Sequence, residues 1–132
     1  MRLHHYGYVV SDVRKGLESF QRTLGAAWDG NIFEDPLQKV RVAFLSTNRD
    51  DPQFELVEPA GMDSPVYRFL TEKGGGLHHA CWQVEDLDAS LAELRGRGCL
   101  IAKKPLPAVA FGGRRIAWLI TPEKLLVELL ES

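Results

Sequence analysis

The chain has 132 residues, of which 45% are hydrophobic and 26% charged, and these proportions are typical of a folded globular protein. Its formal net charge is −2 and the charged residues are scattered, so no surface for binding nucleic acid is expected. The sequence contains no apolar stretch of the roughly 18 residues that a membrane-spanning helix needs, so no membrane association is expected. Cys81 and Cys99 form no CxxC pair and are too few for a disulfide framework, so reduced thiols are expected. The opening MRLHHYGYVV does not resemble a secretory signal, which favours a cytoplasmic protein.

The first predicted elements are a strand, a helix and three more strands. Residues 4–10 are rich in aromatic and β-branched side chains, which is typical of a strand. Asp12 stands where a helix N-cap is expected, and apolar residues follow at helical spacing up to Gly25, which suits a C-cap. Further short strands are predicted at residues 27–33, 40–46 and 54–58.

Residues 59–76 join these elements to a second set. The join contains a short helix over about residues 66–73, followed by the flexible Gly74-Gly75-Gly76. After it we expect a strand at 78–84, a helix from Asp86 to Gly98, and strands at 100–103, 115–120 and 126–131. Both sets therefore have the order βαβββ, and two such modules make an α+β fold.

The two modules also resemble each other in sequence. His5 aligns with His79 at an offset of 74 (79 − 5), and Glu55 aligns with Glu128 at an offset of 73 (128 − 55), with the one-residue slip in a turn. Three segments that share almost one offset are hard to produce by chance. The aligned segments are 4–13 with 78–87, 41–45 with 115–119, and 54–58 with 127–131.

Strand alternation places one histidine and one glutamate of each module on the same sheet face. His5, Glu55, His79 and Glu128 all lie opposite the side chains that are expected to pack under the helices. A single histidine or glutamate on a strand is more often a structural or solvated residue than a metal ligand. A histidine and a glutamate at matched positions in both modules instead favour metal binding. Two imidazoles and two carboxylates suit one divalent cation, Zn²⁺, Ni²⁺, Co²⁺, Mn²⁺ or Fe²⁺, with positions left for water or substrate.

Three segments carry a resemblance to a known family: SPVYRFLTEKGGGLHHACWQVEDLDASLAEL, QKVRVAFL and FELVEP. They resemble the vicinal oxygen chelate superfamily, and within it the methylmalonyl-CoA epimerase branch. The resemblance implies metal ligands at His5, Glu55, His79 and Glu128, the four residues that the repeat indicates. It also implies a glyoxalase-like fold in which two tandem βαβββ modules form a curved, partly closed mixed sheet around a metal-binding cavity. We expect one domain over residues 1–132, with module one at about 1–60, a linker at about 61–76 and module two at about 77–132.

The resemblance further implies an isomerase, epimerase or lyase that removes a proton next to two chelated substrate oxygens and forms a metal-stabilised enolate. Glu128 is the predicted base. Epimerases of this family have a second glutamate shortly before a QxVxVAFL segment, but Leu37 precedes Gln38 here. Glu34 and Asp35 lie close by in the sequence and are the candidate replacements.

Three further residues are predicted to contact a small-molecule substrate, for which an acyl-CoA is one candidate. They are Cys81 and Gln83, which share a face with His79, and Arg114 in the loop of residues 105–115. His4 and His78 point to the opposite face and are expected to be structural or solvent-exposed. Related proteins are commonly dimers, so a homodimer is expected.

Other functions remain open within the same family. One is a glyoxalase I-like lactoylthiol lyase, and another is a protein of the bleomycin-resistance type that binds a metabolite or antibiotic. The second type often lacks the metal ligands, which are all present here. An extradiol dioxygenase is disfavoured because it normally binds its metal through two histidines and one carboxylate.

Overall fold

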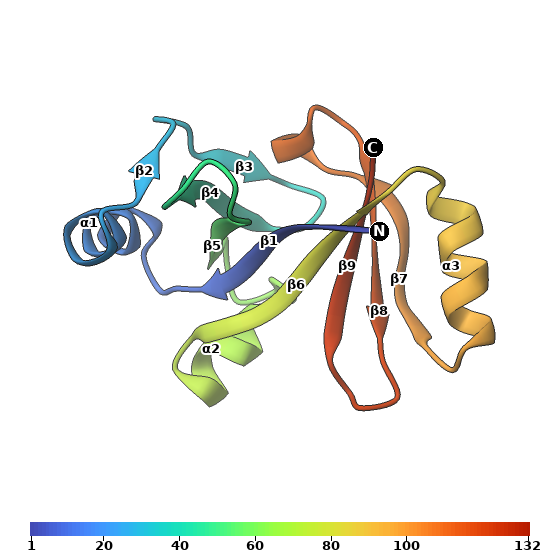
Figure 1. Ribbon diagram of the computed structural model, residues 1–132. Coiled ribbons are helices and arrows are strands. Elements are labelled where there is room, and N and C mark those ends of the chain that lie inside the picture. Colours follow the sequence, from blue (N-terminus) through green and yellow to red (C-terminus); the bar gives the residue numbers. More distant parts are fainter. The chain divides into compact units, whose positions relative to one another are not determined.

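The computed structural model describes all residues from Met1 to Ser132. By their internal contacts these residues form two compact units. The first unit is His5–His78, and the second unit is His79–Ser132 together with Met1–His4. In Figure 1 the first unit runs from blue to light green, and the second runs from yellow-green to red and also includes the dark blue N-terminal residues Met1–His4. The two units correspond to the two copies of the repeat. The expectation that the chain is one domain remains a prediction.

The first unit is a mixed sheet with one helix packed against it and a short helix after it. Its strand order is β2-β4-β5-β1, and β3 also pairs with β4. Strands β1 and β5 are parallel, and the other pairs are antiparallel. The elements are β1 (Arg2–Val9), α1 (Val13–Leu24), β2 (Ala27–Trp28), β3 (Phe33–Asp35), β4 (Val40–Ser46), β5 (Gln53–Pro59) and α2 (Tyr67–Lys73).

The second unit repeats this topology. Its strand order is β6-β9-β8-β7, with β6 and β9 parallel and the other pairs antiparallel. In each unit, therefore, the first and last strands of the βαβββ order are parallel neighbours. The elements are β6 (Gly76–Val84), α3 (Leu87–Gly96), β7 (Leu100–Pro107), the 3₁₀ turn η1 (Val109–Phe111), β8 (Arg115–Ile120) and β9 (Leu126–Glu131).

The predicted helix N-caps are present in both units, and the predicted C-cap glycine is present in the first. Asp12 is the N-cap of α1, and its Oδ1 accepts hydrogen bonds from the backbone N–H groups of Arg14 and Lys15. Asp86 caps α3 in the same way. Gly25 ends α1 at φ 64°, a left-handed conformation that glycine adopts without strain. None of the three helices is both long enough and apolar enough to cross a lipid bilayer.

A hydrophobic core lies between the helix and the sheet in each unit. Leu17 of α1 packs with Leu56 of β5, and Leu91 of α3 packs with Leu129 of β9. The opposite face of the second unit's sheet carries a smaller cluster of Cys81, Ala108, Ile116 and Leu130. The expected strand alternation is therefore confirmed: even and odd positions of β6 and β9 belong to different clusters.

The structure differs from the predicted elements in three places. The single strand expected at 27–33 is two short strands, β2 and β3, separated by a turn in which the backbone N–H of Asn31 donates to Asp29. Helix α3 ends at Gly96 rather than Gly98. Strand β7 continues past residue 103 to Pro107 because register shifts against β8 accommodate the extra residues.

An arginine–glutamate pair anchors the start of the helix in each unit. In the first unit Glu58 accepts hydrogen bonds from Arg41 at 2.6 Å and from the backbone N–H of Val13 at 3.0 Å. In the second unit Glu131 accepts from Arg115 at 2.7 and 2.8 Å. The backbone of Leu87 at the start of α3 also bonds to Glu131. The repeat thus extends to the contacts that join the helix to its sheet.

The second of these pairs predicts a pH-dependent stability. The hydrogen bond from Arg115 holds the pKa of Glu131 below its ordinary value. A carboxylate whose folded pKa is below its unfolded pKa stabilises the fold above the unfolded pKa, and this contribution disappears as pH falls through the folded pKa. We therefore expect Glu131→Gln to lower the urea midpoint at neutral pH, with the deficit shrinking as the solution is acidified below about pH 4. The exposed Glu123→Gln is the control and should leave the midpoint unchanged at every pH.

Candidate functional site: a histidine–glutamate pair in each unit

The first unit brings His5 and Glu55 together. They lie on the parallel neighbours β1 and β5, where Gly7 is the Cα partner of Glu55. His5 Nε2 is 3.7 Å from Glu55 Oε1, and both side chains are buried. Phe44, the Cα partner of Glu55 on β4, sets its ring edge-on to the imidazole of His5, with 5.5 Å between ring centroids. The aromatic contact restricts the orientation of the imidazole beside the carboxylate.

The second unit contains the same arrangement. His79 Nε2 is 3.5 Å from Glu128 Oε2, and both side chains are almost completely buried. Trp118, the Cα partner of Glu128 on β8, lies edge-on to His79 with 4.7 Å between centroids. The sequence reasoning singled out neither Phe44 nor Trp118. The signal was available, since the two aromatic residues are themselves related by the offset of 74 (118 − 44).

The distance within each pair fits two metal ligands better than a hydrogen bond. A direct N–H···O bond spans about 2.7–3.2 Å, which is shorter than both distances. Two donor atoms that each lie about 2.1 Å from one cation are about 3–4 Å apart, depending on the coordination geometry. The distances of 3.7 Å for His5 with Glu55 and 3.5 Å for His79 with Glu128 lie in that range. A divalent cation would also balance the charge of the two buried carboxylates.

His4 and His78, which precede His5 and His79 in the sequence, contact different aromatic residues from those beside His5 and His79. The ring of His4 lies edge-on to Phe111, with 5.5 Å between centroids. The ring of His78 lies edge-on to Phe69 at 4.9 Å. Both histidines thus pack against an aromatic ring that is separate from the aromatic neighbours of His5 and His79. Their structural role remains a prediction.

The three predicted substrate contacts have unequal access to solvent. Cys81 is fully buried, and its thiol donates a hydrogen bond to Glu128 Oε1 across 3.4 Å. Gln83 is half-buried on the same strand face. Arg114 bonds within its own region: it donates to the carbonyl oxygens of Phe111 and Glu131, and its guanidinium lies 5.7 Å from the Phe111 ring centroid. Substrate contact by these residues remains a prediction.

The two candidate replacements for the second base are both engaged in other contacts. Glu34 is exposed, and its Oε1 accepts from Arg41 Nε at 3.1 Å. Asp35 is buried and closes the β3–β4 turn: Oδ1 accepts from the backbone N–H groups of Leu37 and Gln38, and Oδ2 accepts from the side-chain amide of Gln38. These hydrogen bonds tie both oxygens of Asp35 to the turn that it closes. Leu37 itself is 57% exposed.

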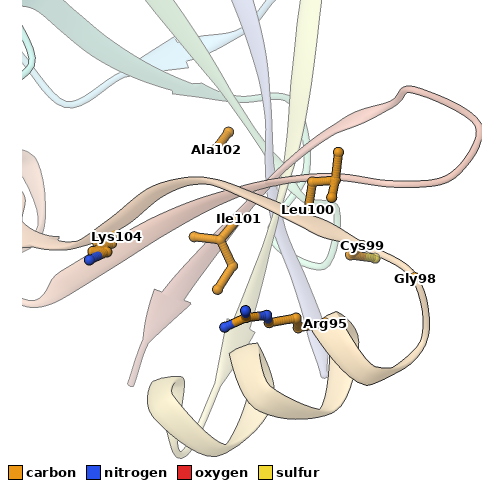
Figure 2. Close-up of a pocket in the computed structure, with 7 residues that line it drawn as sticks. All are labelled: Arg95, Gly98, Cys99, Leu100, Ile101, Ala102 and Lys104. Atoms are coloured by element: carbon orange, nitrogen blue, oxygen red, sulfur yellow. The ribbon is translucent and has the colours of Figure 1, made fainter.

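A surface hollow in the second unit is separate from the His79–Glu128 pair. It lies between the C-terminal end of α3 and the start of β7, as Figure 2 shows. Cys99 and Ile101 of this hollow pack with the core on the α3 side of the sheet, whereas Glu128 follows Val127 of that core and so points to the opposite face. The hollow is lined by Arg95, Gly98, Cys99, Leu100, Ile101, Ala102 and Lys104.

Comparison with known proteins identifies relatives that match most of the chain. The sequence profile of the Glyoxalase/Bleomycin resistance protein/Dioxygenase superfamily matches residues 4–118. Ethylmalonyl-CoA/methylmalonyl-CoA epimerase of Cereibacter sphaeroides is 30% identical over 119 residues, which are 89% of this chain and 87% of that protein. Mitochondrial methylmalonyl-CoA epimerase of Homo sapiens is 33% identical over 95 residues, which are 71% of this chain but 52% of that protein. The matched region thus spans about half the length of the human relative.

Solved structures give the same relationship. Methylmalonyl-CoA epimerase from Mycobacterium tuberculosis has a TM-score of 0.86 at 27% identity, covering 98% of this chain and 87% of that chain. A variant of Streptomyces coelicolor methylmalonyl-CoA epimerase in complex with 2-nitronate-propionyl-CoA has a TM-score of 0.85 at 29% identity, covering 100% of this chain and 97% of that chain. The expected fold class of tandem βαβββ modules is therefore confirmed, and the chain is similar to methylmalonyl-CoA epimerases over its full length.

Proposed function

Because the chain belongs to the Glyoxalase/Bleomycin resistance protein/Dioxygenase superfamily, we propose that it is a metal-dependent isomerase of the methylmalonyl-CoA epimerase type, which removes and returns the proton on the carbon next to an acyl-CoA carbonyl. In this proposal His5, Glu55, His79 and Glu128 jointly hold one divalent cation, and Glu128 also moves the proton. The observation that carries the proposal is the recurrence of one buried histidine–glutamate pair in each unit, at 3.7 and 3.5 Å.

The chemistry of the donors supports a divalent transition metal. Imidazole nitrogen and carboxylate oxygen together suit Zn²⁺, Ni²⁺, Co²⁺, Mn²⁺ or Fe²⁺. Four protein ligands leave one or two positions of a six-coordinate ion for oxygens of the substrate. When bound, the cation would stabilise negative charge on those oxygens as the proton leaves the adjacent carbon. The charge of the two carboxylates balances that of the ion.

Glu128 is the proposed base because the family resemblance assigns that role to the glutamate of the closing strand, and its carboxylate is held in a defined direction. Its Oε2 lies near His79, while its Oε1 accepts from Cys81, so both oxygens have a defined direction. A carboxylate held in one orientation beside the acidic carbon transfers a proton without first having to reorient. Trp118 and the apolar side chains around Cys81 keep water away from this group.

An acyl-CoA is the proposed substrate class because similar proteins act on it. The relatives from Cereibacter sphaeroides and Homo sapiens are epimerases of methylmalonyl-CoA, and the Streptomyces coelicolor protein binds a propionyl-CoA analogue. Methylmalonyl-CoA has a thioester oxygen and a carboxylate oxygen placed to chelate one ion, with an acidic carbon between them. The cytoplasmic location and the homodimer remain predictions.

The proposed chemistry uses one base rather than two. Leu37 stands where epimerases of this family have a glutamate, and both nearby acids are engaged, Glu34 by Arg41 and Asp35 by the turn that it closes. A single base removes and returns the proton on one face of the carbon, so inversion requires a proton delivered from solvent to the opposite face of the enolate and is the slower process. We therefore expect proton exchange to be much faster than interconversion of epimers.

The test is to load the metal-free protein with Co²⁺, incubate it in D₂O with a single epimer of methylmalonyl-CoA, and follow deuterium at C2 together with inversion. Deuterium uptake that is at least about 10²-fold faster than inversion is the expected result. Leu37→Glu, which supplies a carboxylate at the position of the missing base, should raise inversion without raising exchange to the same extent. Equal rates of exchange and inversion in the unmodified protein would contradict the one-base proposal. Failure to bind any cation would contradict the metal site itself.

A further inference from the structure

The carboxylate of Glu128 is held from two directions within the second unit. On one side, Oε2 is 3.5 Å from His79 Nε2. On the other side, Oε1 accepts a hydrogen bond from the Cys81 thiol at 3.4 Å. Cys81 is also the Cα partner of Glu128 across the parallel β6–β9 pair, so the backbone register places the thiol beside the carboxylate. Two contacts on different oxygens define the plane of the carboxylate as well as its direction.

The surroundings of the thiol strengthen this contact. Cys81 is 0% exposed and lies in a cluster with Ala108, Ile116 and Leu130, all of them apolar. A hydrogen bond to a charged acceptor is stronger in such a medium than in water, since water does not compete for either partner. The same burial keeps Cys81 from direct contact with bulk solvent, which disfavours a role as a surface contact for substrate.

The two units differ at the strand position that Cys81 occupies in the second unit. Cys81 aligns with Gly7 at the repeat offset of 74 (81 − 7), and Gly7 is the Cα partner of Glu55 just as Cys81 is the Cα partner of Glu128. Glycine has no side chain, so the strand neighbour of Glu55 supplies no equivalent donor. The histidine, the aromatic residue and the glutamate are thus repeated in both units, whereas the thiol is present in the second unit alone.

We propose that Cys81 is a positioning residue that fixes Glu128 as a one-oxygen ligand, with Oε1 held by the thiol and Oε2 directed to the cation. This inference rests on the proposed function, because it assigns Glu128 to the metal. It explains why the two glutamates of a symmetric ligand set need not act alike. The thiol restrains Glu128, which is the proposed base, whereas Gly7, the strand partner of Glu55, has no side chain that could make the same contact.

The first test measures Co²⁺ affinity by titration calorimetry in four proteins: the unmodified chain, Cys81→Ala, Cys81→Ser and Cys99→Ala. Loss of a hydrogen-bond partner behind a metal ligand typically weakens metal binding by about 10- to 100-fold, and we expect that loss for Cys81→Ala. Cys81→Ser retains a donor and should stay within a few-fold of the unmodified chain. Cys99 lies on the α3 side of the sheet, so its replacement is the matched control and should change nothing.

The second test needs no metal. In the Cys99→Ala background Cys81 is the remaining cysteine, so the S–H stretching band in the Raman spectrum reports on it alone. A thiol that donates to a carboxylate should have this band at lower frequency than in the same protein with Glu128→Ala. An unchanged band would mean that the thiol does not donate to Glu128, and would overturn the inference irrespective of activity.

The outcomes separate this inference from the proposed function. Cation binding that is weakened by Cys81→Ala and retained by Cys81→Ser supports both. Cation binding that Cys81→Ala leaves unchanged overturns the role of Cys81 while the metal site stands. An intense near-ultraviolet sulfur-to-Co²⁺ absorption band that Cys81→Ala removes would make Cys81 itself a ligand and also overturn the positioning role. Absence of cation binding in the unmodified chain overturns the proposed function and the ligand-positioning role with it.

Discussion

Glu128→Gln should reduce the rate of α-proton exchange into methylmalonyl-CoA by about 10²- to 10⁴-fold, the usual contribution of a positioned base. The amide has nearly the shape of the carboxylate, so the fold and the contact with His79 should survive, but it cannot accept the proton at neutral pH. The amide is also a weaker ligand because it carries no charge, so Co²⁺ affinity should fall as well. Exchange is measured by mass spectrometry at saturating Co²⁺, so that the loss of the base is separated from the loss of the ion.

Two further variants test whether the slower proton exchange of Glu128→Gln comes from the loss of the base. Glu123→Gln removes an exposed carboxylate from the turn before β9 and should exchange protons at the rate of the unmodified chain. Glu55→Gln removes a ligand without removing the base, so at saturating Co²⁺ its rate should fall less than that of Glu128→Gln. Equal losses for the two glutamate variants at full metal occupancy would contradict the assignment of the base to Glu128.

Alanine at either His5 or His79 should weaken Co²⁺ binding by more than about 100-fold, because each variant removes a ligand itself rather than a group behind one. The effect should be similar in the two variants, although the two histidines belong to different units. This similarity follows from the proposal that both histidine–glutamate pairs hold a single ion. If each pair bound an ion of its own, His5→Ala would leave the affinity of the other pair intact.

The sequence offers a close control for each of these variants. His4→Ala and His78→Ala remove the adjacent histidines, which pack against Phe111 and Phe69. Both should keep Co²⁺ affinity within a few-fold of the unmodified chain, with some loss of thermal stability from the missing ring contact. A loss of binding in His78→Ala as large as in His79→Ala would mean that the fold, rather than the ligand set, is responsible.

The repeat and strand alternation were sufficient to predict much of this organisation. An offset of 74 between His5 and His79 predicts that both histidines occupy the same position of equivalent strands, and a period of two predicts which face they share. The structure accordingly buries His5 with Glu55 and His79 with Glu128. Both inferences depend on local regularities that are visible in one sequence.

Contacts that depend on register could not be predicted in the same way. Alternation shows that Cys81 and Glu128 share a face, but the hydrogen bond between them requires that the two residues be direct partners in the parallel β6–β9 pair. A shift of two residues would keep the face and lose the contact. Phe44 and Trp118 were missed for a different reason, since aromatic residues in strands are ordinary core residues unless a functional partner is already known.

Turn chemistry accounts for the division of the strand that was expected at residues 27–33. Residues 27–33 have the hydrophobic pattern of one strand, but Gly30 at φ 90° and the Asx turn from Asp29 to Asn31 divide them into β2 and β3. The position of Asp35 near Leu37 in the sequence makes it a candidate base. Its three hydrogen bonds to Leu37 and Gln38 make it instead the residue that closes the following turn.

The central claim is that the two histidine–glutamate pairs together hold one cation, and native mass spectrometry of the Co²⁺-loaded chain tests it most directly. The spectrum should show one Co²⁺ bound per chain in the unmodified protein, and none in either His5→Ala or His79→Ala at the same free Co²⁺ concentration. Two ions per chain, or one ion retained after the loss of either histidine, would contradict the account.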